Sequence, residues 1–345
     1  MDIIKIKSLD DEKAGFVYDV SQIIIKEIIK NPSLIPDLSK ERTIFVFSDY
    51  SKVRGKYKTY SYLIIGRSSA DYFNGARKHL REDFNLSNRR MSYKTLNDKI
   101  KLKALPAFLS LAGAMKGILV TFAVDTRIKY MFAEQFLEGG DNPFPIKKNT
   151  LEETLRITHF GSQAIMNAFS SKQNIVWFTD SDAIVANEDH EIAFGKLAET
   201  LIRKMFMPNE NIGKIGFGVS EVDNGSLEIE DFISIPDLVS GAICETLDRC
   251  RENDLRVATK IMINMPKVSR KTNLICDWLG KIYCPLQKFG VVFDKVGNGK
   301  WDFRPTFFRI ENPNISDCEI NCKIQEKDMD IYDPIHFDIE DYILK

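Results

Sequence analysis

Cysteine is confined to the last third of the chain, and long apolar runs are missing. All six cysteines of the 345 residues lie at or after Cys244, and no pair has the spacing of a zinc knuckle. We therefore expect buried free thiols rather than disulfides. The start lacks a secretory signal, and the most apolar stretch, residues 104–124, is interrupted by Pro106, Gly113 and Lys116. These absences predict a cytoplasmic protein with no membrane span.

Net charge is nearly absent as well. Lys and Arg number 48 against 49 Asp and Glu, so the chain as a whole has no electrostatic bias towards nucleic acid or an anionic membrane. The sequence contains no Gly-Lys-Ser/Thr phosphate loop, no Gly-x-Ser-x-Gly elbow and no His-Glu-x-x-His helix. These absences disfavour kinase, serine hydrolase and zincin functions. The apolar share of 44% is enough for a sizeable core and excludes global disorder.

Apolar periodicity indicates alternating strands and helices. Strands are expected at residues 43–49, 59–66, 117–125 and 174–180, and helices at residues 10–30, 68–84, 96–113, 151–170 and 191–206. The first two strands are expected to form an antiparallel hairpin. Residues 212–222 and 227–233 flank Asp223-Asn224-Gly225, a strong turn signal, and Pro236 is expected in the first turn of a helix over residues 237–249.

This order of elements predicts an α/β protein, with a mixed β-sheet that carries helices on its faces. Residues 1–42 are a helical lead-in, and residues 43–253 form the main domain. Residues 254–345 are a C-terminal α+β extension, in which residues 290–294 and 301–304 are expected to pair as a hairpin. The end of the extension is an acidic tail, with seven acids and one Lys in residues 326–341.

Three aspartates fall where a buried element begins or ends. Asp49 closes the first strand, Asp180 closes a later one, and Asp237 opens a helix; Asp182 follows Asp180 by two residues. Carboxylates brought together repel one another unless a cation lies between them, and their hard oxygens suit Mg²⁺ or Mn²⁺. Two such ions promote phosphodiester cleavage by activating water. Each acid also has a purely structural interpretation, as a turn cap or as a partner of the helix dipole.

Residues 77–103 are basic, with nine Lys or Arg against three acids, and aromatic residues are interleaved with the charges. Such a stretch suits contact with a nucleic-acid backbone, although a solvent-facing pair of helices has the same composition. Lys94 within it is a candidate to neutralise a phosphate. His190 is a candidate proton shuttle or metal ligand, and otherwise a helix cap. His159 lies in an apolar helical stretch, where a functional role has less support.

Two motifs resemble a known family. Residues 43–51, which end in Ser-Asp-Tyr-Ser, look like the opening strand of the domain-of-unknown-function 3800 family, whose first motif is Asp-Glu-Ser-Gly. Residues 235–243 look like the family's later Ala-Asp-Leu-Val-Ala-Gly-Ala motif. The resemblance covers roughly residues 43–250. It implies a ribonuclease-H-like fold and a metal-dependent nuclease, in a bacterial defence or mobile-element setting.

The resemblance also assigns roles to single residues. It implies that Asp49 is the first-strand carboxylate and Asp237 the helix carboxylate, with either Asp180 or Asp182 as the central acid. Tyr50 stands where the family has Glu, so one metal ligand of the motif is absent from this chain.

Three functions remain open at this point. The leading hypothesis is a nuclease that hydrolyses RNA or DNA with Mg²⁺ or Mn²⁺, because it accounts for three acidic positions and the basic stretch. Residues 176–184 also resemble the Asp-x-Asp motif of nucleotide-sugar glycosyltransferases, in which Asp180 and Asp182 would hold Mn²⁺ against a diphosphate. The third is a catalytically silent family member that binds nucleic acid or a protein partner.

Overall fold

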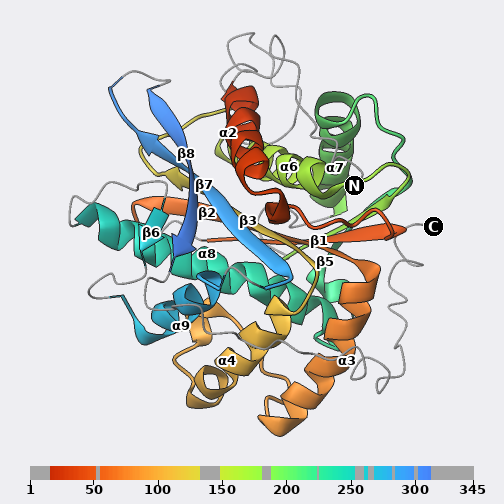
Figure 1. Ribbon diagram of the computed structural model, residues 1–345, viewed down its shortest axis with the longest axis vertical. Coiled ribbons are helices and arrows are strands. Elements are labelled where there is room, and N and C mark those ends of the chain that lie inside the picture. Colours follow the sequence, from red (N-terminus) through yellow and green to blue (C-terminus); the bar gives the residue numbers. More distant parts are fainter. Residues whose placement is uncertain are drawn as a thin grey trace.

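The computed structural model describes residues 16–51, 55–132, 148–180, 188–223, 225–252, 260–262, 268–281, 284–298 and 302–311. Its centre is a mixed β-sheet with helices on both faces, as the sequence predicts (Figure 1). The strands are β1 (Thr43–Tyr50), β2 (Tyr57–Gly66), β3 (Gly117–Asp125), β4 (Asn174–Thr179), β5 (Ile215–Val219), β6 (Lys260–Met262), β7 (Leu286–Lys295) and β8 (Phe303–Glu311).

The strand order across the sheet is β5-β4-β1-β2-β3-β7-β8-β6. Antiparallel pairs join β1 to β2, β2 to β3 and β7 to β8, which confirms both hairpins expected from the sequence. The remaining neighbours, β1 with β4, β4 with β5, β3 with β7 and β6 with β8, are parallel. Since β7 pairs with β3, the C-terminal strands continue the same sheet.

Two layers of helices cover the sheet (Figure 1). One face carries α2 (Phe16–Lys30), α6 (Lys148–Ala168) and α7 (Glu188–Thr200), and the other carries α3 (Arg67–Asp83), α4 (Lys99–Gly113), α8 (Glu228–Glu252) and α9 (Arg270–Leu279). Shorter turns are η1 (Pro32–Leu34), η2 (Tyr93–Thr95), the π-helical η3 (Leu201–Phe206) and η4 (Ser220–Asp223). Hereafter the α8 face means the side of the sheet that α3, α4, α8 and α9 cover.

Strand alternation divides the apolar side chains between two cores. In β1, Ile44 and Val46 belong to the core under α2, α6 and α7, whereas Phe45 and Phe47 belong to the core under α8. The ring of Phe47 stacks on Phe232 of α8 at 4.4 Å between centroids. Both faces of β1 are therefore buried, which explains why its sequence is an uninterrupted apolar run.

The expected start of the helix at residue 237 is wrong, because residues 227–233, which follow the turn signal, lead into α8 and form its first two turns. Ile229, Phe232 and Ile233 are all buried at helical spacing. The side chain of Asp223 accepts the backbone N–H of Ile229, and three acids in the first turn suit the positive end of the helix dipole. Pro236 consequently lies inside the helix rather than at its first turn.

Two further expectations, on membrane spans and on the cysteines, can be compared with the structure. None of the helices in the described ranges is long and apolar enough to cross a membrane. Cys244, Cys250, Cys276 and Cys284 are free thiols; Cys250 and Cys276 are buried, as expected, whereas Cys244 and Cys284 are half-buried. The other two cysteines lie outside the described residues.

Candidate functional site

Asp49 and Asp180 come from neighbouring parallel strands and continue rows of side chains on the α8 face. Asp49 follows Phe45 and Phe47 at alternate positions of β1, and Asp180 follows Val176 and Phe178 of β4, all four of which pack under α8. The last pair in register is Ser48 with Thr179, one residue before the two acids. Neighbouring strands are about 5 Å apart, so the two aspartates leave the sheet side by side.

Asp237 reaches the same region from above the sheet. Three residues further along α8, the Ser240 hydroxyl donates to the Asp49 carbonyl oxygen at 3.3 Å and lies 2.9 Å from the Ser61 hydroxyl. Residues three apart in a helix share a face, so Asp237 is about one turn from the end of β1. Burial raises the pKa of Asp237, and the negative charge of Asp180 raises it further. The structure therefore places three of the four acids predicted from the sequence on the same face of the sheet, near the ends of β1 and β4.

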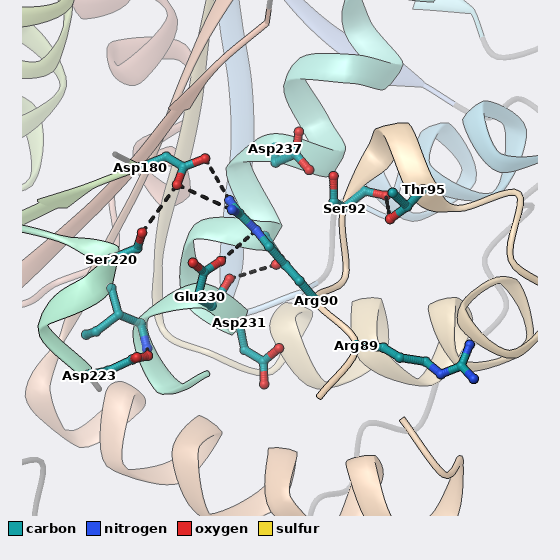
Figure 2. A network of polar contacts seen from close by, with 12 residues as sticks. Arg89, Arg90, Ser92, Thr95, Asp180, Ser220, Asp223, Glu230, Asp231 and Asp237 are labelled. Carbon is teal, nitrogen blue, oxygen red and sulfur yellow. Dashed lines mark hydrogen bonds and ion pairs between the residues drawn. The ribbon is translucent and has the colours of Figure 1, made fainter. Parts of the chain in front are cut away.

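Arg90 lies among these acids. Its Nη2 donates to Asp180 Oδ2 at 2.9 Å, and its Nε is 2.6 Å from Glu230 Oε2 in an ion pair. Figure 2 shows the guanidinium between the two carboxylates, with Asp237 further along α8. Burial opposes the positive charge of Arg90, but the bonds to Asp180 and the charges of Asp180 and Glu230 outweigh it and raise the arginine's pKa.

Glu230 is a fourth acid that the sequence hypothesis did not include. It precedes Asp237 by seven residues, which is close to two helical turns, so both carboxylates lie on one face of α8. Burial raises the pKa of Glu230, and Asp180 adds to this rise, although Arg90 opposes it. The sequence signal for Glu230 was the i, i+7 spacing, which becomes visible only when residues 228–236 are assigned to a helix.

A second ion-pair group fixes the start of α8 against α3. The Asp231 carboxylate is fully buried and accepts from Arg77 Nη1 at 2.9 Å and from Arg81 Nη1 at 2.8 Å. Arg81 Nη2 also donates to the carbonyl oxygens of Ser87 and Arg89. The loop that carries Arg90 is thus bound to the same helix end as its partner Glu230.

Tyr93 fixes the orientation of Asp237. Its backbone N–H donates to Asp237 Oδ2 at 2.8 Å, and its hydroxyl donates to Glu245, two turns further along α8. Lys271 of α9 donates to the Tyr93 carbonyl at 2.8 Å and lies 4.0 Å above the ring. Gly241 makes room for this ring, because a Cβ there would lie 2.2 Å from it. Asp237 is therefore held by the backbone of a turn that α8 and α9 both support.

The site offers carboxylate oxygens, which are the ligands that Mg²⁺ and Mn²⁺ prefer. Within the described ranges, however, no three Asp, Glu, His or Cys side chains are placed to hold a metal ion together. The guanidinium of Arg90 lies against two of the four acids, Asp180 and Glu230. The donor set thus fits a divalent ion in its chemistry, while its present arrangement fits the arginine.

The remaining predicted residues have different outcomes. Lys94 is exposed on η2, next to the Tyr93 amide that holds Asp237. His190 lies in the first turn of α7, on the opposite face of the sheet from α8. Asp182 lies outside the described residues. Tyr50 also points away from the α8 face, since its hydroxyl lies 2.7 Å from the hydroxyl of Ser48 and accepts from Thr179.

The basic stretch is less available to a ligand than its composition suggests. Five of its nine cations form ion pairs with acids: Arg77, Lys78, Arg81, Arg89 and Arg90. Lys101 is buried and donates to the Thr95 hydroxyl. Lys94, Lys99 and Lys103 are exposed. Acids from α8 and from the end of β4 account for much of the compensation, and their proximity was not visible in the sequence.

Comparison of the chain with models of known protein families finds no match, and comparison with curated proteins finds none either.

Proposed function

We propose that this protein is a divalent-metal-dependent nuclease with a ribonuclease-H-like core. The observation that carries the proposal is the convergence of Asp49, Asp180 and Asp237 on one side of the sheet, from two adjacent strand ends and a helix. The resemblance to the domain-of-unknown-function 3800 family implies carboxylates at Asp49 and Asp237, and a central acid that is either Asp180 or Asp182.

The topology of the first five strands supports the fold assignment. Their order is β3-β2-β1-β4-β5, with β2 antiparallel to both of its neighbours and β4 and β5 parallel to β1. A mixed sheet flanked by helices is the architecture that we expect for the ribonuclease-H-like fold implied by the resemblance. Tyr50 in place of the family's Glu does not count against the site, since its side chain lies on the other face of the sheet.

The chain's own residues divide the work. Asp49, Asp180 and Asp237 are the metal ligands, and the Tyr93 amide keeps Asp237 oriented towards the strand ends. Bound ions of this kind lower the pKa of water and stabilise the leaving oxygen in phosphodiester hydrolysis. Lys94, Lys99 and Lys103 contact the phosphate backbone of RNA or DNA without reading sequence. His190 has no part in the chemistry, because it belongs to the opposite layer of helices.

The experiment is a cleavage assay on single- and double-stranded RNA and DNA, with Mg²⁺, Mn²⁺ or a chelator. We expect metal-dependent products that fall by roughly 10²-fold or more in Asp49→Asn and Asp237→Asn. The matched control is Asp83→Asn, an exposed aspartate at the end of α3, which should cleave at the wild-type rate.

Other outcomes separate the alternatives. Undiminished cleavage in Asp237→Asn would sink the assignment of the site. Binding of a nucleoside diphosphate with Mn²⁺, in the absence of any cleavage, would favour the glycosyltransferase function. Retention of nucleic acid by the protein without turnover in any metal would identify a silent binding protein.

A further inference from the structure

A single guanidinium, that of Arg90, lies between two carboxylates of the candidate site and pairs with both, Asp180 and Glu230. Asp237 lies further along α8 in the same region (Figure 2). A cation with two charges would therefore be favoured over a guanidinium at the same place.

The geometry points to Arg90 as a built-in competitor of the metal. We propose that its guanidinium occupies the position of a divalent cation and that metal binding displaces it. Glu230 then becomes a metal ligand beside Asp49, Asp180 and Asp237. This inference rests on the proposed function of the site and adds a residue and a regulatory contact to it.

The displacement requires only the side chain to move. The backbone around Arg90 is held on both sides, by Arg81 at the carbonyls of Ser87 and Arg89 and by Asp237 at the Tyr93 amide. The Arg90 side chain itself is 30% exposed, so its long, flexible stem can swing into solvent without unfolding the loop. Glu230 belongs to α8, so its carboxylate keeps its position when the Arg90 side chain moves away.

The test measures metal affinity directly, by electron paramagnetic resonance of free Mn²⁺ in titrations of the full chain without nucleic acid. Arg90→Gln should bind Mn²⁺ roughly tenfold more tightly than the wild type, because the competing charge is gone. Glu230→Gln should bind it more weakly, and the double variant should lose the gain. Arg89→Gln is the matched control, since Arg89 pairs with Asp98 instead, and it should bind as the wild type does.

A second variant and a second readout guard against loss of structure. Arg90→Lys keeps the charge and should leave the Mn²⁺ affinity close to the wild-type value. In thermal unfolding, Arg90→Gln should melt lower than the wild type without metal and gain more from added Mn²⁺. An Arg90→Gln protein that is destabilised, yet binds Mn²⁺ no better, would overturn the inference and leave Arg90 with a purely structural role.

The two proposals fail separately. Tighter Mn²⁺ binding by Arg90→Gln, with no nucleic-acid cleavage by any form of the protein, would overturn the nuclease function and leave the competition intact. Metal-dependent cleavage together with an unchanged Mn²⁺ affinity in Arg90→Gln would overturn the competition alone.

Discussion

His159 is a buried core residue, in keeping with the apolar helical stretch that surrounds it in the sequence. Its ring stacks on Phe132 at 4.1 Å between centroids, in the core opposite the candidate site. Nδ1 lies 2.8 Å from the Leu155 carbonyl oxygen and must donate its proton there, because a carbonyl only accepts. Burial lowers the pKa of His159 to about 4 from 6.5. The residue therefore belongs to the packing and not to the chemistry.

A pH dependence of stability follows from this pKa. Between pH 6.5 and 4 the unfolded chain takes up a proton at His159 that the folded chain refuses, so the free energy of unfolding falls as the pH falls. The loss attributable to His159 should reach about 3 kcal/mol by pH 4. We expect urea unfolding of His159→Gln to depend less on pH in this window than that of the wild type.

The control for this prediction is His79→Gln, whose wild-type side chain is 62% exposed. It should retain the wild-type pH dependence. An equal flattening in both variants would show that burial of His159 is not the cause.

At the scale of elements, α8 decides the geometry of the site. This helix carries Glu230, Asp231 and Asp237, and it reaches Tyr93 through Glu245. Its start was mispredicted, because the Asp-Asn-Gly turn signal and Pro236 favoured a helix that begins only at residue 237. The buried i, i+3, i+4 pattern of Ile229, Phe232 and Ile233 outweighs the cost of an internal proline, since all three pack into the core.

The contact between α8 and η2 predicts how the substitution Gly241→Ala, which adds one methyl group, changes the free energy of unfolding. In Gly241→Ala the new Cβ would lie 2.2 Å from the Tyr93 ring, so the turn must shift and its amide must move from Asp237. We expect a loss of about 1–3 kcal/mol in the free energy of unfolding, measured by urea titration.

Gly75→Ala in α3 is the matched control, because a Cβ there meets nothing within 4 Å. Alanine is the better helix former, so this variant should gain up to about 1 kcal/mol. Equal stability changes in the two variants would mean that the ring contact at Gly241 is not tight.

At the scale of the whole molecule, the sheet continues past the boundary that the sequence suggested after residue 253. Strand β7 pairs with β3 and contributes Val291 to one core and Val292 to the other, and β8 adds Phe308. A chain that ends at Glu252 would expose β3 as an edge and open both cores. The C-terminal strands are therefore part of the sheet that positions the site.

We expect the chain truncated after Glu252 to bind the dye ANS and to lose the cooperative urea transition of the full chain. Cooperative unfolding of the truncated chain, with no ANS binding, would contradict this and support an independent domain.

Most of the sheet and the layers of helices were predictable, because strands such as β1 and β3 are long apolar runs and α3, α4 and α6 have clear helical periods. Asp49 and Asp180 were predictable as candidates, since each stands at or near the end of a recognised strand, whereas Asp237 was chosen as the opening of a helix and in fact lies inside α8. Arg90 and Glu230 were not, because their meeting depends on the placement of a loop between α3 and α4 against α8. Pairings of that kind leave no trace in local periodicity.

The bond from the Tyr93 amide to Asp237 has a consequence for the evolution of the site. Every residue except proline has a backbone N–H, so nearly any codon change at position 93 leaves this donor in the chain. The bonds from Arg90 belong to one side chain, and a single nucleotide change can delete them. Over generations, the backbone donor itself therefore survives substitution at position 93, while the arginine contact is free to drift or to be selected.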